Sequence, residues 1–303
     1  MRLRNLSPIA LVLAGVIAVA GCGKSSTGPT SPANTEQVQI TNYMAGNPGL
    51  IDDQLFTDPA SLPLSRLQGT NAAITPRWFW RRITVSTPHL TFQFSDTDSV
   101  GRPRLASVTL TRHLVGTFNI LPAASGDTTA LDSSNIIHKP LDDTWTRHLL
   151  FKRCVVPGSM DPQWRLIAAS GVQVNSSGMT EQIQSVRVQT GTMDTTLTDP
   201  LQLFVITHCM HMAAGDSVML TVTTSKTDDV VLAYYRDLRL RFHPNGDGTY
   251  VIKLPVGSLL GMRFFGVNAL SHGTLFDDTL PYDSQAWLFH SWVGPPPSTE
   301  YYQ

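Results

Sequence analysis

Apolar residues recur at every second position along much of the chain after residue 78, a period typical of β-strands with one buried face. The clearest example is the run ASVTLT at residues 106–111, in which Ala, Val and Leu alternate with Ser and Thr. Ile83–Val85 and Leu90–Phe94 are predicted as two strands separated by Pro88. Arg147–Val155 and Trp164–Val174 are predicted as two more.

The turn between these last two strands is marked by Pro157-Gly158 and Asp161-Pro162. Helical signals are confined to residues 36–70. They are short mixtures of apolar and polar residues at Glu36–Met44, Ile51–Phe56 and Leu62–Leu67, the first two split by Asn47-Pro48-Gly49. Helices followed by a long antiparallel sheet predict an α+β arrangement for residues 36–176.

Residues 177–293 show a different pattern, in which short strand-like runs recur at regular spacing with turn residues between them. This pattern predicts an all-β sandwich. Asn245-Gly246-Asp247-Gly248 precedes Thr249-Tyr250 and is predicted to form a tight hairpin, because glycine tolerates positive φ. The predicted runs are Ile183–Val188, Leu201–Ile206, Val218–Thr223, Val230–Tyr235, Leu238–Phe242, Tyr250–Leu254, Met262–Ala269 and Ala286–Trp292.

The order of elements in residues 36–176 resembles the NTF2-like superfamily. The pieces that carry this resemblance are Phe79–Arg82, Ala106–Gly116, Arg147–Arg153 and Trp164–Leu166. It implies short N-terminal helices packed on a curved sheet around a cone-shaped pocket. Some members are enzymes with an Asp or His in the cone and others only bind. No such catalytic residue can be matched by position here.

The hairpin at residues 245–250 resembles the NGDGTY turn of bacterial immunoglobulin-like modules. This second resemblance implies an immunoglobulin-like sandwich with a role in display, spacing or adhesion, although a fold alone does not define a function.

The N-terminus resembles the signal peptide of bacterial lipoproteins. Arg2 and Arg4 precede an apolar run of about a dozen residues, too short to span a bilayer. Val19-Ala20-Gly21-Cys22 then resembles a lipobox, which implies cleavage before Cys22 and acylation of that cysteine. Gly23, rather than aspartate, follows it, so the resemblance favours the outer membrane. The alternative is an ordinary secretory signal with a chance cysteine.

These observations divide the chain into five predicted segments. Residues 1–21 are a lipoprotein signal peptide and residues 22–35 are a lipidated cysteine with a flexible tether, because this stretch contains no bulky apolar side chain to bury. Residues 36–176 are the NTF2-like domain, residues 177–293 the immunoglobulin-like sandwich, and residues 294–303 a tail.

The charge balance speaks against nucleic acid as a partner. Removing the signal peptide takes away two of the 22 basic residues and none of the 23 acidic ones, which changes the formal net charge from −1 to −3. The predicted partners are the membrane, through the acyl chains, and an unknown small molecule or protein. No cofactor is predicted.

If Cys22 is lipidated, Cys154 and Cys209 remain in an oxidising compartment, where they either pair as a disulfide or stay as two buried thiols. Cys209 also lies in the run His208-Cys209-Met210-His211-Met212. On a strand, alternation would put His208, Met210 and Met212 on one face, a possible three-ligand copper site. The alternative is a strand end with half-buried His and Met.

Asn245, Asp247 and Gly248 also fit the middle of a calcium loop. The register fails, however, because His243 and Leu254 fall where carboxylate ligands are needed. Three pairs of adjacent acids are interpreted as solvated loop residues rather than as sites: Asp142-Asp143, Asp228-Asp229 and Asp277-Asp278.

A basic and aromatic cluster at Arg77–Arg82 is the densest candidate binding patch. Trp78, Trp80, Arg81 and Arg82 could dock onto headgroups, glycan or an acidic partner, and the alternative is a strand whose aromatic and basic side chains pack in the ordinary way. His113 is predicted to face solvent, or to line the pocket of an NTF2-like cone.

The chain contains no nucleophile elbow, zinc-protease helix, phosphate loop or dinucleotide fingerprint. The leading hypothesis is therefore a non-enzymatic cell-envelope lipoprotein that binds or presents something. The rival is an isomerase-type or hydrolase-type enzyme working in a cone pocket, which requires a buried ionisable residue with a perturbed pKa. A copper-handling protein is a third hypothesis.

Overall fold

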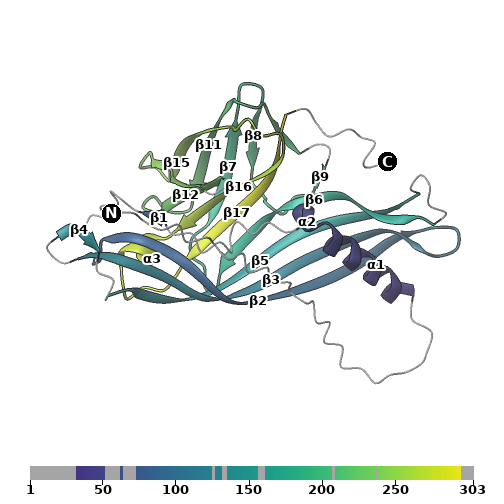
Figure 1. Cartoon of the computed structure of the whole chain (residues 1–303), viewed down its shortest axis with the longest axis horizontal. Helices are drawn as coiled ribbons and strands as arrows, with labels where there is room; N and C mark the ends of the chain where they lie inside the picture. The colour runs from purple at the N-terminus through teal and green to yellow at the C-terminus, as the bar shows by residue number, and fades with distance from the viewer. Residues whose placement is uncertain are drawn as a thin grey trace, which may run out of the picture.

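The computed structural model describes residues 32–51, 62–63, 73–124, 127–131, 135–155, 161–206, 209–235 and 238–294. Within them the protein is mostly β, and two sheets account for the strands. Long strands run the length of the molecule along one side, and a shorter layered unit stands over part of them (Figure 1).

The long strands form the first half of a large antiparallel sheet. β2 (Pro76–Thr97) pairs with β3 (Pro103–Ala124), β3 with β5 (Ile137–Cys154), and β5 with β6 (Gln163–Ser176). Two short strands extend it at its margin, β1 (Leu62–Pro63) beside β2 and β4 (Asp127–Leu131) beside β3. Along β5 the buried positions alternate strictly with outward ones, as a period of two requires.

The same sheet continues into the C-terminal half of the chain. β6 pairs with β17 (Ser284–Val293), which pairs with β16 (Gly261–Leu270), and the order continues through β12 (Val230–Tyr235) to β13 (Leu238–Arg241). β9 (Phe204–Val205) joins β6, and β10 (Met210–Met212) joins β17 in parallel. The sheet therefore crosses the predicted boundary between residues 176 and 177.

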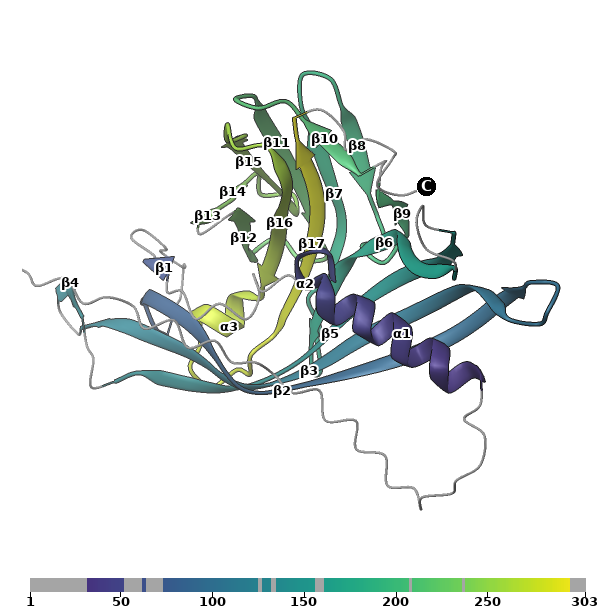
Figure 2. The same ribbon diagram turned by 45° about the vertical axis from the view of Figure 1, so that its right-hand side comes forward.

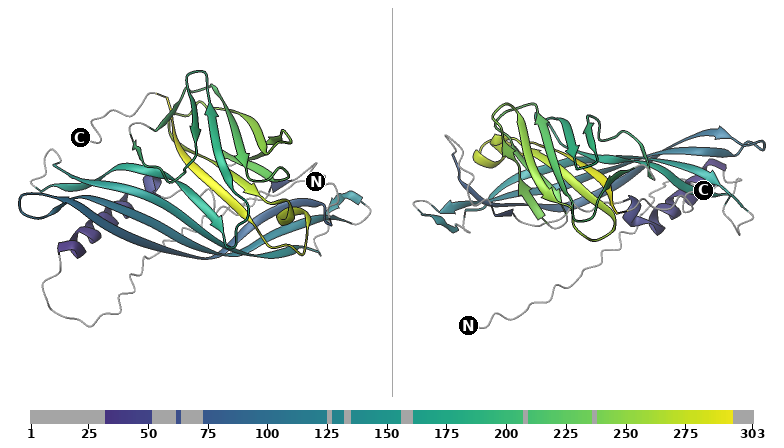
Figure 3. Two further views of the ribbon diagram at one scale, coloured as in Figure 1. Left: turned by 180° about the vertical axis from the view of Figure 1, so that it is seen from behind. Right: turned by 90° about the horizontal axis from the view of Figure 1, so that it is seen from above.

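The second sheet is smaller and has five strands in the order β14-β15-β11-β7-β8. Figure 3 shows it standing over β16 and β17 in both views. The strand bounds are β7 Ile183–Gln189, β8 Asp194–Leu197, β11 Ser217–Thr224, β14 His243–Pro244 and β15 Thr249–Pro255.

β12, β16 and β17 form the middle layer, because they are covered on both faces. Leu232 and Leu288 face the core shared with the long strands, while Val231 and Trp287 face the core shared with the small sheet. Nearly every position of β12 and β17 is buried as a result. The continuous apolar runs in these strands follow from burial on both faces.

Helices are few among the described residues. α1 (Pro32–Gly46) lies against the long strands (Figure 2), where Ile40 and Met44 enter the core and Tyr43 meets Phe151 edge to face. Its Glu36 accepts hydrogen bonds from Arg153 at 2.9 Å and from Trp164 at 2.6 Å. The remaining helical pieces are α2 (Pro48–Ile51) and α3 (His272–Phe276).

The predicted α+β fold of the NTF2-like type is wrong. The first half consists of very long strands with α1 as the only helix of more than five residues in the described chain, and the sheet is completed by strands from the second half. α1 covers the predicted helix Glu36–Met44, whereas most of the other two predicted helices, Ile51–Phe56 and Leu62–Leu67, lies outside the described residues.

The second half is a sandwich only in a coarse sense. Two sheets pack face to face, as the predicted β-sandwich requires, and one of these layers is the continuation of the large sheet. Sequence periodicity reports which positions are buried and not which strand buries them.

Two local predictions have clear outcomes. Pro88 does not separate two strands, because β2 runs through it. Among the described residues this stretch of β2 pairs only with β3, and proline is tolerated in such edge strands. The hairpin at Asn245 is confirmed: Gly246 and Gly248 have φ of +87° and +86°, and Asn245 N–H donates to the Thr249 carbonyl at 2.9 Å.

α1 begins at Pro32, within the segment predicted as a tether. No helix among the described residues combines the length and apolar character needed to span a bilayer.

Candidate functional site

A cavity of about 450 Å³ lies where β6 and β17 part from one another. The two strands pair from Gln285 opposite Asn175 to Leu288 opposite Val172 and are not paired beyond that point. Beyond it, β6 pairs with β9 at Ala168 and Ala169, and β17 pairs with β10 from Ser291 onward. We call this cavity, bounded by the two diverging strands, the fork cavity.

The lining of the fork cavity is mostly apolar. It comes from the large sheet, from β8 of the small sheet, and from the segment that carries β9 and β10. The lining residues are Arg147, Leu166, Ala169, Ser170, Gly171, Thr192, Met193, Thr195, Leu197, Phe204, Ile206, Cys209, Met210, His211, Met262, Phe289, His290 and Trp292.

Gly171 marks the point of the fork. A Cβ there would lie 2.4 Å from the Leu288 carbonyl oxygen and 2.9 Å from the Pro200 carbonyl oxygen, so no side chain fits. The chain therefore needs glycine at this close approach of the backbones, just before the strands separate.

Arg147 supplies a positive charge to the cavity. It lies on β5 opposite Val172, where the pairing of β6 with β17 ends, and it is 1% exposed. Its Nη2 lies 2.8 Å from Nε2 and 3.2 Å from Nδ1 of His290. Arginine can only donate, so the imidazole nitrogen that accepts must be unprotonated.

His290 is accordingly a neutral imidazole. Burial and, secondarily, the charge of Arg147 hold the pKa of His290 well below its ordinary value of about 6.5. Phe264 packs edge to face on this ring, with 4.4 Å between ring centres. The arrangement fixes the ring and leaves the guanidinium as the charged group of the pair.

The predicted copper ligands are divided by the structure. Met210 lines the fork cavity, Met212 is buried in the core beneath the small sheet, and His208 lies outside the described residues. Other soft donors do line the cavity, namely Met193, Met262 and Cys209. Within the described chain, however, no three His, Cys, Asp or Glu residues are grouped as a metal site.

Cys154 and Cys209 are both free thiols in the structure. Cys209 lines the cavity, and burial raises the pKa of its thiol. Cys154 ends β5, where its Sγ contacts the Lys152 carbonyl. The predicted lipidation site, Cys22, lies outside the described residues.

The predicted aromatic and basic patch is split between two faces of β2. Trp78 and Trp80 are partly buried and Arg82 is exposed, whereas Arg81 points into the core and is 2% exposed. Alternation along the strand accounts for this split. His113 is solvent-exposed, as one of its two predicted alternatives had it, and its Nε2 lies 2.6 Å from Asp142.

Arg81 is instead the centre of a buried polar network that joins β2 to the C-terminal strands. It donates to the Tyr234 hydroxyl at 2.9 Å and to the Tyr282 hydroxyl at 3.0 and 3.1 Å. Tyr282 in turn donates to Asp143 at 3.2 Å. Burial raises the pKa of Asp143 to about 6, even though Arg81 acts in the opposite direction. None of these four residues lines the fork cavity, so we interpret the network as structural.

The paired acids are not uniformly solvated. Asp143 and Asp229 are buried, while their neighbours Asp142 and Asp228 are exposed. Asp277 is partly buried and Asp278 exposed.

Asp229 lies beside the fully buried Glu181. Burial, together with Asp229, raises the pKa of Glu181 far above its ordinary value. The Glu181–Asp229 pair therefore retains a proton at neutral pH.

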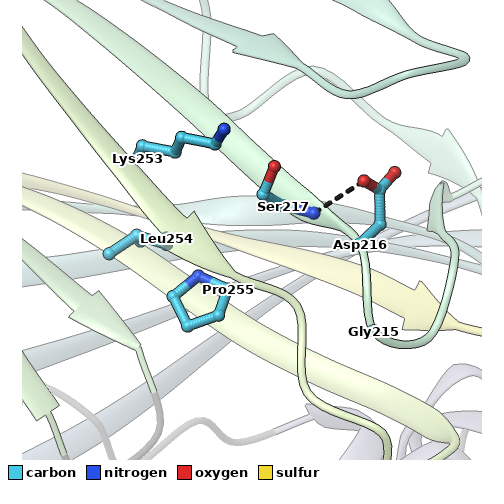
Figure 4. Close-up of a pocket in the computed structure, with 6 residues that line it drawn as sticks. All are labelled: Gly215, Asp216, Ser217, Lys253, Leu254 and Pro255. Atoms are coloured by element: carbon cyan, nitrogen blue, oxygen red, sulfur yellow. Dashed lines mark hydrogen bonds between the residues drawn. The ribbon is translucent and has the colours of Figure 1, made fainter.

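A second depression lies on the surface at the start of β11 (Figure 4). Its residues are few, and the Asp216 carboxylate accepts a hydrogen bond from the neighbouring Ser217 N–H at 2.7 Å. It is open and lined by only six residues, so the more enclosed fork cavity is the stronger candidate.

Sequence reasoning missed Arg147 and His290. The burial of Arg147 could have been predicted, because it lies an even number of residues from the apolar Trp145, Leu149 and Phe151. On a strand with period-two burial these residues face the same side. The pairing with His290, 143 residues further along the chain, had no such signal.

Comparisons with protein-family models, with curated proteins and with solved structures find no match to this chain. The functional assignment must therefore come from the cavity itself.

Proposed function

We propose that this protein is a non-enzymatic cell-envelope lipoprotein that binds a small, largely apolar molecule in the fork cavity. The observation that carries the proposal is the cavity itself, about 450 Å³ in volume and lined mainly by apolar side chains. Ligand sites of small molecules have this size and character, with a few polar groups that fix orientation.

The chemistry of the cavity favours binding over catalysis. The Cys209 thiol has a raised pKa, which disfavours the thiolate that a nucleophile needs. His290 is buried with a perturbed pKa, as the enzyme hypothesis required, but the shift is downward and its ring accepts from Arg147. A weakly basic imidazole whose nitrogen is already engaged is a poor general base.

The N-terminal pattern supports the proposed location. An apolar run followed by Val19-Ala20-Gly21-Cys22 is typical of a lipoprotein signal. Several acyl chains on Cys22 would hold the protein stably at a membrane, since each buried CH₂ contributes about 0.8 kcal/mol. The proposed compartment is the outer membrane of a bacterial envelope, with an additional protein partner left open.

Filling the cavity tests this proposal. Thr195 lines the cavity from β8, and its neighbour Thr196 is exposed outside it, so Thr195→Trp and Thr196→Trp are a matched pair. Nile red, a neutral dye whose fluorescence rises in apolar surroundings, is the probe. We expect Thr195→Trp to weaken dye binding at least about tenfold, or 1.4 kcal/mol, and Thr196→Trp to leave it unchanged. Equal binding by both variants would refute the fork cavity as the site.

A further inference from the structure

The side chains around the fork cavity indicate the class of ligand. We propose that the ligand is an uncharged molecule built around an aromatic ring, which is held by methionine sulfurs and by the aromatic side chains of the wall. This inference rests on the proposed function and narrows it from an apolar molecule to an aromatic one.

Methionine is concentrated around the cavity. Three of the eighteen lining residues are methionine, against nine of the 303 residues in the chain. They come from three separate elements: Met193 precedes β8, Met210 begins β10, and Met262 lies near the start of β16. A thioether sulfur makes favourable contacts with aromatic rings, and its unbranched side chain adapts to the shape of a bound molecule. A saturated molecule of the same size gains only from the second property.

Aromatic side chains supply further parts of the wall, namely Phe204, Phe289 and Trp292. Trp292 on β17 lies directly opposite Met262 on β16, so an indole ring and a thioether are neighbours on one face of the sheet. Two aromatic rings attract each other edge to face or in offset stacks by more than their buried area accounts for. Both kinds of wall group therefore favour a ring as the occupant.

These wall groups are open to a ligand. Met193, Met210, Met262 and Trp292 each keep part of their surface exposed. Arg147, in contrast, is 1% exposed. The accessible part of the wall at these positions is thus thioether and aromatic in character.

The cavity offers a charged ligand no free counter-charge. Among the described residues, its lining includes no Asp, Glu or Lys. Arg147 is buried and already engaged by His290 and by a further interaction, so it is not free to pair with an anion. A cation would meet the same guanidinium, which stays protonated at any physiological pH. Because burial of an unpaired ion is costly, an uncharged molecule is favoured.

The experiment measures the displacement of Nile red at neutral pH by four probes of equal chain length. Phenylpropanol and cyclohexylpropanol differ only in the saturation of the ring, whereas phenylpropanoate and the phenylpropylammonium cation carry opposite charges. We expect phenylpropanol to bind at least about threefold more tightly than cyclohexylpropanol, although the saturated ring is the more hydrophobic. Both ions should bind at least about tenfold more weakly than phenylpropanol. Equal or tighter binding of cyclohexylpropanol, or of either ion, would overturn the inference while leaving the cavity intact.

Substitution of the methionines gives an independent readout. Met193→Leu, Met210→Leu and Met262→Leu, combined in one variant, remove the three sulfurs and nearly conserve side-chain volume. We expect the preference for phenylpropanol over cyclohexylpropanol to fall by at least about threefold in this variant. The control is Met212→Leu, on the same strand as Met210 but buried in the neighbouring core, and it should keep the wild-type preference. An unchanged preference in the triple variant would contradict the role of the sulfurs and overturn the inference.

The remaining outcomes separate this inference from the proposed function. Retained Nile red binding shows that the triple variant is folded, and if it does not fold, the four probes on the wild type decide. Tight binding of silver(I), a soft cation, without binding of phenylpropanol would also overturn the inference. Failure of Nile red to bind the wild type would instead refute the proposed function.

Discussion

Three charged side chains lie on the buried face of β5, at every fourth residue. Lys139 donates to the Gly273 and Asp277 carbonyls at 2.9 and 2.6 Å, Asp143 accepts from Tyr282, and Arg147 contacts His290. Such residues are rarely buried without partners. Each has a partner from the last part of the chain, so these charges tie the long strands to the C-terminal strands.

The Glu181 carboxyl makes the stability of the protein depend on pH. In the unfolded chain it loses its proton near a pH of about 4.3, whereas burial and Asp229 keep the proton on it to higher pH in the folded protein. Above that pH the folded state binds more protons, so the free energy of unfolding falls as the pH rises until the folded carboxyl also ionises.

Glu181→Gln should remove this dependence. The amide oxygen can still accept from Gln182 N–H and Ser225 Oγ, as Glu181 does, without any carboxyl to ionise. We expect urea unfolding to show the variant more stable than the wild type by at least about 1 kcal/mol at slightly alkaline pH, with a smaller difference near a pH of about 5.

Asp194→Asn is the matched control. A hydrogen bond from Arg187 lowers the pKa of Asp194. The stability that this carboxylate contributes is therefore lost only as the pH falls below the ordinary pKa of an aspartate, about 3.9. A Glu181→Gln variant with the same pH dependence as the wild type would contradict the inferred shared proton.

At the scale of elements, the long β2–β3 hairpin depends on one close approach. The register shifts between Ile83 and Val85, and Gly116 lies opposite Ile83. A Cβ on Gly116 would lie 2.0 Å from the Arg82 carbonyl oxygen, which is backbone and cannot rotate away. The bulge therefore requires glycine on the facing strand.

Gly116→Ala should destabilise the protein by about 1 to 3 kcal/mol, because the strands must move apart at the bulge. Thermal or urea unfolding measures this loss. Gly46→Ala at the end of α1 is the control, since nothing lies within 4 Å of the added Cβ, and its effect should stay within about 0.5 kcal/mol. Equal effects of the two substitutions would show that the close approach is not tight in solution.

At the scale of the whole molecule, β17 is the strand that unites the two halves. It pairs with β6 and β16 and contributes residues to both apolar cores. The sequence predicted two domains because the spacing of the strand-like runs changes near residue 177. The pairing of β17 with β6 suggests a direct test of that prediction.

β17, from the second half of the chain, pairs with β6 of the first half, and the apolar core of the long strands contains residues from both halves. We therefore expect one cooperative unfolding transition rather than two. Calorimetry and tryptophan fluorescence should give coincident midpoints, and residues 177–293 expressed alone should not fold with a native midpoint, since β17 would lose β6. Two separate transitions, or a stable isolated fragment, would restore the two-domain interpretation.

The sequence indicated local properties well. The alternation at residues 106–111 and along Arg147–Val155 placed strands where β3 and β5 lie, and Asn245–Tyr250 correctly predicted a hairpin. It failed where the role of a residue depends on a distant partner: the buried hydrogen bonds of Arg81 to Tyr234 and Tyr282 were not foreseen, and Pro88 was interpreted as a break between strands.

The sequence by itself indicated where strands alternate between apolar and polar positions, where a tight turn forms and which N-terminal segment resembles a lipoprotein signal, because these depend on neighbours within a few residues. Only the tertiary structure decided that the large sheet continues from β6 into β17, that these strands then part, and that Arg147 meets His290 beside the resulting cavity. The physical reason is that period-two burial is the same whichever strand lies alongside, so the pairing of strands more than a hundred residues apart leaves no local trace.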